Sequence, residues 1–104
     1  MHFSKLFRVK EGKVDILKQW FAVLSKERKE EAISTFKYEN VEREVFVLFK
    51  GDEGEYYVIG LNEHSGLRKT GDPTVKINQE HTRILVECIE KISGNGEMLL
   101  DLSA

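Results

Sequence analysis

Three patterns in the sequence predict an α+β domain. Apolar residues recur at helical spacing over two segments, at about residues 12–28 and 77–92. Two strand-like segments flank the KGDEGE sequence at residues 50–55, and two more lie toward the ends of the chain. The resulting order, β-α-β-β-α-β, is that of a ferredoxin-like fold, in which two helices cover one face of a four-stranded antiparallel sheet. With 104 residues, the chain is expected to form a single domain over residues 1–104.

The first strand and the first helix follow each other closely. Residues 3–9, FSKLFRV, are rich in Phe and Val and predict a strand, which Gly12 ends. The helix is expected from about residue 12 to 28. Its apolar positions at helical spacing are Val14, Leu17, Trp20, Phe21 and Leu24.

Residues 28–40, RKEEAISTFKYEN, fit two readings. Ala32, Ile33 and Phe36 suit a helix, whereas ISTFKY has the composition of a strand. The charged residues and the lack of turn signals favour a helix. We therefore expect the first helix to continue, bent near residues 25–29, and to end around Asn40.

The second half of the chain begins with a hairpin. Gly51 and Gly54 give the flexible backbone of a tight reversal, which predicts a hairpin over residues 43–62. A long irregular connection, residues 63–76, follows it. The second helix is expected over residues 77–92, with Asn78 or Thr74 as the N-cap, and EMLLDLS at residues 97–103 is expected to form the last strand.

Both faces of the predicted hairpin are apolar. Two helices cover only one face of a sheet, and each large apolar side chain left in water forfeits about 1.5–3 kcal/mol. We therefore expect the second face to pack on the same face of another copy, in a homodimer with twofold symmetry. The alternative is that the long connection and the C-terminal tail fold over it. One face would carry Val45, Val47, Phe49, Tyr57, Ile59 and Leu61, and the other Phe46, Leu48, Tyr56 and Val58.

Composition limits the partners and the compartment. The net charge is -2 and the charges are spread along the chain, so nucleic acid is not expected as a partner. The longest apolar runs have five residues, against the roughly 20 that cross a bilayer, so no membrane association is expected. Without a signal-peptide pattern at its N-terminus, the chain is expected in the cytoplasm. Its one cysteine, Cys88, lies on an apolar helical stripe and is expected to be a small buried hydrophobe.

Three segments, FRVKEGKVDILKQW, RKEEAISTFKYENVEREVFVLF and NQEHTRILVEC, carry a resemblance. They resemble, over nearly the full length, a bacterial family in the dimeric alpha-beta barrel superfamily. The resemblance implies a fold and a dimer but no single activity. Its wider relatives include cofactor-independent monooxygenases, lactone isomerases, sugar mutarotases, haem-degrading enzymes and stress-response proteins, so function has to be argued from the site.

A histidine stands out within the second helical stripe. His81 is expected in the first turn of that helix, facing the sheet, where the positive end of the helix favours a neutral imidazole. Such a group is a candidate catalytic acid or base. The alternative is a histidine at the edge of the core, hydrogen-bonded to a neighbouring strand or carboxylate.

Carboxylates lie close to the expected pocket. Strand alternation would put Glu42 and Glu44 on the same face as Phe46, and Glu39 closes the segment before them. Glu44 is a candidate partner for His81 in catalysis. Arg28 is a candidate for binding an anionic or hydroxylated ligand, or else for a local pair with Glu31 three residues on. The alternative for the whole acidic run is solvated surface charge.

The pair Glu-His occurs at residues 63–64 and again at 80–81, but neighbouring residues on a helix point about 100° apart, so we expect no metal site. No nucleotide, disulfide-exchange or nucleophile motif is present, and no cofactor is expected. Trp20, Phe36, Tyr57 and His64 complete the candidate ligand contacts.

The leading hypothesis is a small-molecule-binding homodimer that uses His81 for proton abstraction or isomerisation, with cofactor-free oxygenation as a variant. The alternative is a ligand-binding or stress-response protein without catalysis. An open cavity with His81 bonded to a carboxylate would favour the former, and a packed core the latter.

Overall fold

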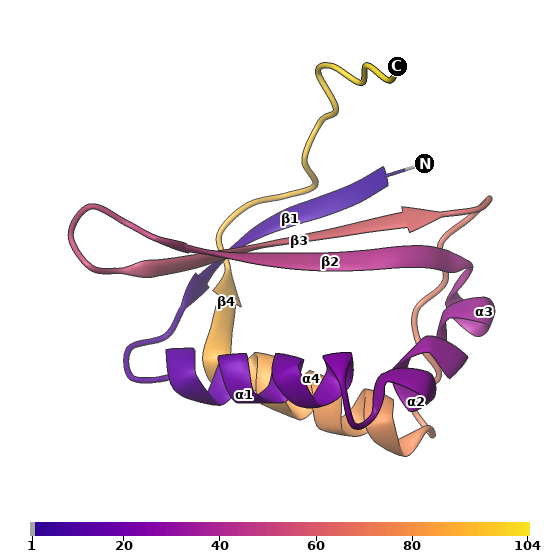
Figure 1. Ribbon diagram of the computed structural model, residues 1–104, viewed down its shortest axis with the longest axis horizontal. Helices are drawn as coiled ribbons and strands as arrows, with labels where there is room; N and C mark the ends of the chain where they lie inside the picture. The colour runs from indigo at the N-terminus through magenta and orange to yellow at the C-terminus, as the bar shows by residue number, and fades with distance from the viewer. Residues whose placement is uncertain (1) are drawn as a thin grey trace.

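A four-stranded antiparallel sheet forms one layer of the protein and helices form the other (Figure 1). The structure is a computed structural model and describes residues 2–104. The strands lie in the order β2-β3-β1-β4 across the sheet, and every neighbouring pair is antiparallel. Their bounds are β1 (His2–Val9), β2 (Val41–Lys50), β3 (Tyr56–His64) and β4 (Ile89–Lys91).

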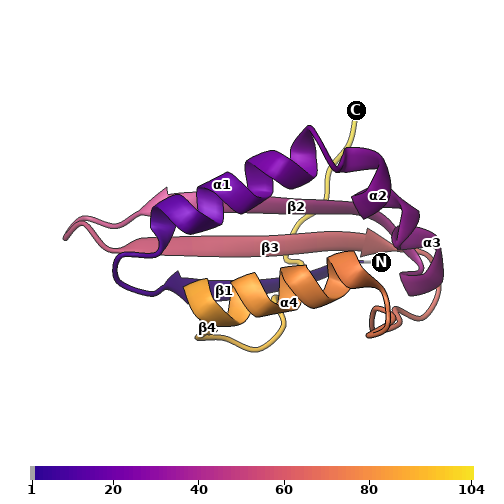
Figure 2. The ribbon, with the colours of Figure 1, turned by 90° about the horizontal axis from the view of Figure 1, so that it is seen from below.

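The helices all lie on one side of the sheet. Seen from the helical side, α1 runs along the β2 side of the sheet and α4 along the β1 side, while α2 and α3 close one end (Figure 2). Their bounds are α1 (Val14–Ser25), α2 (Lys29–Ser34), α3 (Phe36–Glu39) and α4 (Lys76–Cys88). The predicted α+β class and antiparallel sheet with helices on one face are therefore confirmed.

The expected long helix is present as three short ones. α1 ends at Ser25, whose hydroxyl donates a hydrogen bond to the carbonyl of Phe21 at 2.7 Å, and α2 begins at Lys29, so the bend predicted at residues 25–29 is confirmed. At the second break, the Thr35 hydroxyl donates to the carbonyl of Ala32 at 2.8 Å and so competes with the helical backbone. Asn40 ends the region with φ of 60°, a left-handed conformation that asparagine tolerates.

The predicted hairpin is confirmed. Gly51 N–H donates to the carbonyl of Glu55 at 2.6 Å, and Gly54 closes the turn with φ of 87°, a value that suits glycine. From there β2 and β3 pair continuously from Lys50 opposite Tyr56 to Arg43 opposite Glu63. The irregular connection after β3 is also present, over residues 65–75.

The end of the chain differs from the prediction. The expected helix over residues 77–92 ends at Cys88, because Ile89 turns extended, with φ of -132° and ψ of 157°, and pairs with Val9 in β1. Residues 89–91 are thus the last strand, and the EMLLDLS segment at residues 97–103 has no regular secondary structure. An Ile-rich stretch suits both helix and strand, and contact with a strand 80 residues away decided between them.

The N-cap predictions were wrong as well. Val75 occupies the N-cap of α4 and makes no side-chain cap bond. Thr74 instead donates its hydroxyl to Asp72 Oδ1 at 2.7 Å, and Asn78 donates its side-chain amide to the carbonyl of Asp72 at 3.0 Å. Asp72 therefore organises the turn before α4.

The core lies between the helices and the sheet. Leu17 from α1, Val58 from β3 and Cys88 from α4 are almost completely buried. Burial raises the pKa of the Cys88 thiol, which keeps it protonated, so the prediction of a small buried hydrophobe is confirmed. Val9 and Ile89 join the same cluster, so the short β4 closes the core at that end.

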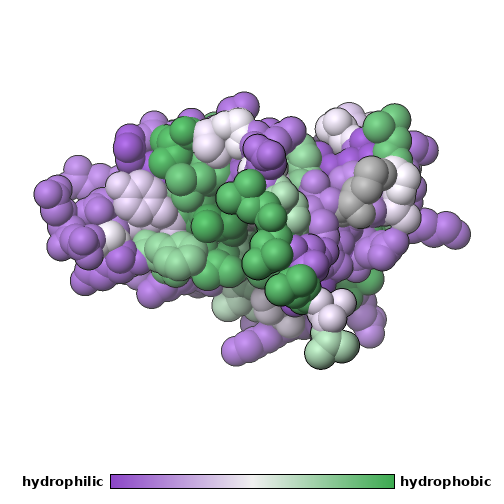
Figure 3. Space-filling model, turned by 90° about the horizontal axis from the view of Figure 1, so that it is seen from above, coloured by the Kyte–Doolittle hydropathy of each residue, from purple (hydrophilic) through white to green (hydrophobic). Residues whose placement is uncertain are grey.

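The opposite face of the sheet is apolar and open, as the hairpin pattern predicted. Val47, Phe49 and Ile59 are 45%, 49% and 37% exposed, and apolar side chains gather over the middle of this face (Figure 3). The C-terminal residues do not cover it, because Leu99 and Leu102 are themselves 88% and 82% exposed. The alternative in which the tail folds over the face is therefore wrong for this structure.

Truncating a core leucine tests the packing. We expect Leu17→Ala to lower the free energy of unfolding by about 2–5 kcal/mol, because the side chain is only 2% exposed and its removal leaves a cavity. Leu67→Ala is the matched control, since Leu67 is 83% exposed and its truncation should change the free energy by less than about 0.5 kcal/mol. Urea unfolding followed by circular dichroism measures both, and equal losses would contradict the assigned core.

Candidate functional site

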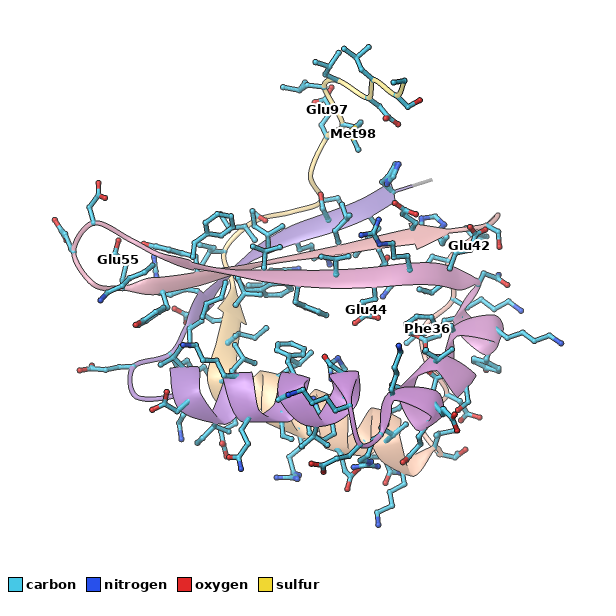
Figure 4. The ribbon with its side chains drawn as sticks, viewed as in Figure 1. Phe36, Glu42, Glu44, Glu55, Glu97 and Met98 are labelled. Atoms are coloured by element: carbon cyan, nitrogen blue, oxygen red, sulfur yellow. The ribbon has the colours of Figure 1, made fainter. Side chains whose placement is uncertain are left out.

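A cavity of about 620 Å³ lies between the sheet and the helices. Its walls come from α1, α2, α3, β2 and the first half of α4. Glu44 points from β2 into the space between the sheet and the helices, and Phe36 points toward it from α3 (Figure 4). The break between α1 and α2 lets α2 and α3 turn toward β2 and close one end of this space. The volume suits a small organic molecule.

One wall of the cavity is apolar. Phe21 from α1 and Phe46 from β2 stack with ring centroids 4.6 Å apart. Gly60 on β3 makes room for this pair, because a Cβ at position 60 would lie 2.8 Å from the Phe46 ring. Leu48 and Ile77 extend the same wall. The apolar side chains and aromatic faces of this wall together suit a ligand with a flat or compact carbon skeleton.

His81 lines the cavity, but its setting differs from the expectation. It lies in the second turn of α4, and its Nδ1 accepts a hydrogen bond from the indole N–H of Trp20 at 2.9 Å. Burial lowers the pKa of His81 to about 4, so the imidazole is neutral at physiological pH. The neutral state agrees with the prediction, although its cause is burial and not the helix terminus. With Nδ1 as acceptor, the remaining proton sits on Nε2, which is a donor.

Trp20 holds His81 through this hydrogen bond but does not itself line the cavity. It is 8% exposed, and the guanidinium of Arg28 lies 5.7 Å from its ring. Arg28 in turn donates two hydrogen bonds of 2.9 and 2.7 Å to Glu31, and its Nη1 lies 2.5 Å from Oε2 of Glu80. The local pairing with Glu31 is confirmed. Since two carboxylates already hold the guanidinium, Arg28 acts as a clamp over Trp20 and not as part of the cavity wall.

The acidic end of the cavity contains Glu39 and Glu44. Burial and the neighbouring charge of Glu39 raise the pKa of Glu44, whereas Arg68 opposes the shift. Arg68 lies over the Phe3 ring at 4.6 Å, and its Nε is buried without a hydrogen-bond partner among residues 2–104. A carboxyl group with a raised pKa and a neutral histidine in the wall of one cavity are suited to proton transfer with a bound molecule.

Glu42 does not share this position. The register between β2 and β3 shifts between Val41 and Arg43, and this bulge interrupts the alternation that the prediction assumed. Glu42 is exposed near the start of β2, away from the cavity (Figure 4). Arg43 instead joins the cavity wall.

Two further candidates lie apart from the cavity. Tyr57 pairs with Phe49 and Arg8 across the sheet, on the open face. His64 ends β3, and its Nδ1 lies 2.9 Å from the carbonyl of Gly66. Of the candidate residues, the structure brings together His81, Glu44, Phe36 and Glu39 and leaves Trp20, Arg28, Tyr57 and His64 outside the cavity wall.

Several polar residues of the wall were not predicted from the sequence. Asn78 is one of them, three residues before His81 and thus on the same side of α4, so helical spacing was a signal that could have found it. Lys18 and Lys29 gave no such signal, because charged residues on an amphipathic helix usually face water.

The described residues offer neither a metal-binding cluster nor a membrane-spanning helix. Among residues 2–104, no three His, Cys, Asp or Glu side chains form a group that would hold a metal ion. No helix in the same range is both long and apolar enough to cross a membrane.

The fold and the cavity define a small α+β protein with an internal pocket that combines an apolar wall with a titratable end. The chain belongs to a family of unknown function, DUF6176, whose family model matches residues 3–104. No curated protein and no solved structure matches the chain.

Because the pKa of His81 is lowered in the folded protein, the free energy of unfolding should depend on pH. The unfolded histidine takes up a proton near pH 6.5 and the folded one near pH 4, so the neutral form favours folding. This contribution is fully present above pH 6.5 and should be lost, by about 3 kcal/mol, as the pH falls from 6.5 to 4. Urea unfolding of the wild type and of His81→Gln across this pH range separates the contribution of His81 from that of the carboxylates. Identical pH profiles for the two proteins would contradict the lowered pKa of His81.

Proposed function

We propose that this protein binds a small organic molecule in the cavity between its sheet and helices. The observation that carries the proposal is the cavity itself, about 620 Å³ in volume, with His81 and Glu44 both in its wall. Protein interiors are close-packed, and an open space of this size forfeits dispersion contacts that a filled core would have. A bound molecule would restore those contacts.

The wall suggests the chemistry of the ligand. Stacked Phe21 and Phe46 favour a flat, apolar body. The Nε2–H of His81 and the amide of Asn78 would donate hydrogen bonds, so the ligand would carry an acceptor such as a carbonyl oxygen. Glu39 and Glu44 at the other end disfavour a second anionic group there.

The reaction that this arrangement supports is isomerisation by proton transfer. Glu44, whose pKa is raised, would take a proton from the carbon beside the carbonyl and return it at another position. His81 would donate to the carbonyl oxygen, where negative charge develops, and a neutral imidazole is a strong enough donor for that role. The roles differ from the first expectation, since Glu44 is the base and His81 the donor. Cofactor-free oxygenation would begin with the same deprotonation.

A non-catalytic role is the second candidate, and one observation favours it. His81 is oriented by the Trp20 indole and not by a carboxylate, which is the partner that a catalytic histidine base usually has. In that case the same cavity would hold a ligand without changing it.

The fold and assembly extend the proposal. The strand order β2-β3-β1-β4, with α1 and α4 on one face, supports the ferredoxin-like arrangement that the dimeric alpha-beta barrel resemblance implies. The open face, with Val47, Phe49 and Ile59, supports a homodimer in which two sheets pack face to face.

Binding and chemistry can be tested with 2-tetralone, a compact aromatic ketone with acidic C–H groups. We expect millimolar or tighter binding by ligand-observed NMR, and at least tenfold weaker binding to Ala32→Phe, because Ala32 lines the cavity and the added ring fills it. Ala22→Phe is the matched control, since Ala22 is exposed on α1. Equal binding by both variants would place the ketone elsewhere.

The same ketone reports on catalysis. In D₂O, the protein should accelerate deuterium exchange at the carbon beside the carbonyl, and Glu44→Gln should slow this at least a hundredfold while leaving binding within about threefold. Binding without accelerated exchange would support the non-catalytic candidate, and exchange that survives in Glu44→Gln would contradict the role given to Glu44.

A further inference from the structure

The C-terminal segment stands away from the rest of the chain. Residues 97–102 leave the sheet on the side opposite the helices and extend outward, as Glu97 and Met98 show (Figure 4). Within residues 2–104, no hydrogen bond joins residues 97–104 to the body of the protein. The exposed fractions are 51% for Met98, 88% for Leu99, 71% for Leu100 and 82% for Leu102.

The root of this segment is fixed. Ile92 N–H donates to the carbonyl of Leu6 at 3.1 Å, and Gly96 N–H donates to the carbonyl of Ser4 at 2.7 Å. A Cβ at position 96 would clash with the Ser4 hydroxyl, so glycine allows the close approach to β1. The chain therefore follows the outer edge of β1 as far as Gly96 and leaves it at a defined place.

The segment has the pattern of a strand with one fully apolar side. Met98, Leu100 and Leu102 share one parity, and Glu97, Leu99 and Asp101 fall on the other. Complete burial of each large side chain is worth about 1.5–3 kcal/mol, so leaving them all in water forfeits a sum comparable to the stability of a small domain. Exposed side chains of this kind favour contact with an apolar surface.

The open face of the sheet offers a matching surface. The strand register places Leu6, Ile59 and Val47 in one row across three strands. Phe49 and Tyr57 form the next row, and Val45 and Leu61 the row on the other side. The segment leaves the molecule on this same side but points away from its own face (Figure 1), so the surface it can reach by extending belongs to a second copy.

The reach of the segment fits that arrangement. Six extended residues span roughly 20 Å, about twice the roughly 10 Å that separates two packed sheets. A stable interface buries about 800 Å² on each partner, or 20–30 residues a side, which is more than the strand residues of one open face provide. The C-terminal segment would supply the missing contacts.

We propose that residues 97–102 form an exchanged arm, in which Met98, Leu100 and Leu102 of each chain pack on the apolar sheet face of a second copy. The proposal rests on the sheet-face dimer proposed above. It adds that the arm holds the dimer together. Because each chain gives one arm and receives one, the exchange closes with twofold symmetry.

Sedimentation velocity between 0.1 and 100 μM tests the arm. The full chain should be a dimer in the micromolar range, and a chain that ends at Gly96 should dimerise at least a hundredfold more weakly. Leu100→Glu, which changes one exposed side chain and keeps the full length, should weaken the dimer at least tenfold. Leu67→Glu is the matched control, because Leu67 is also largely exposed, at 83% against 71% for Leu100, but lies in the connection after β3. Circular dichroism checks that each variant is folded. If the shortened chain does not fold, the dimer affinity of the Leu100→Glu variant tests the arm by itself.

Hydrogen exchange gives a second reading, in which the amides of residues 97–102 should gain protection as the dimer forms. A shortened chain and a Leu100→Glu chain that dimerise as tightly as the full one would overturn the arm and leave the sheet-face dimer standing. A full chain that stays monomeric at 100 μM would overturn both. Assemblies larger than a dimer would overturn the reciprocal exchange, and none of these results bears on 2-tetralone binding, which is measured separately.

Discussion

The dominant constraint on this protein is a sheet with two apolar faces and helices for only one of them. α1 and α4 shelter the face that carries Phe46, Leu48 and Val58, and the hydrophobic core forms there. The other face keeps Val47 and Phe49 half exposed. Because burying such side chains is the main favourable term in folding, the open face favours association, and the proposals for a dimer and for its exchanged arm both follow from it.

On the sheltered side, the helices do not fill the available space. The chain turns at residues 26–28 and again at Thr35, so α2 and α3 bend toward β2 at one end and enclose a cavity of about 620 Å³ beneath the sheet. A space of this size costs stability, since its lining atoms lack partners across the gap. Proteins retain destabilising features of this kind mainly at functional sites. The functional proposal therefore rests on the cavity more than on the fold.

Within the cavity, one hydrogen bond sets the chemistry of the histidine. The indole N–H of Trp20 is donor-only, so the Nδ1 of His81 has to be an acceptor, and the ring presents its Nε2–H. Arg28, held by Glu31 and Glu80, lies over Trp20 and limits its movement. The result is a fixed neutral donor in the wall of the same cavity as Glu44, a carboxyl group whose pKa is raised by burial.

Local pattern determined much of this from the sequence alone. The hairpin, the bend near residue 25, the end at Asn40 and the burial of Cys88 all follow from spacing, turn residues and apolar stripes, which act between near neighbours. Contacts between distant segments decided the rest: the pairing of Ile89 with Val9, the meeting of Trp20 with His81, and the bulge that turned Glu42 away. The sequence does not contain these, because each depends on which of several compatible surfaces come together once the chain is folded, and that choice is made by packing in three dimensions.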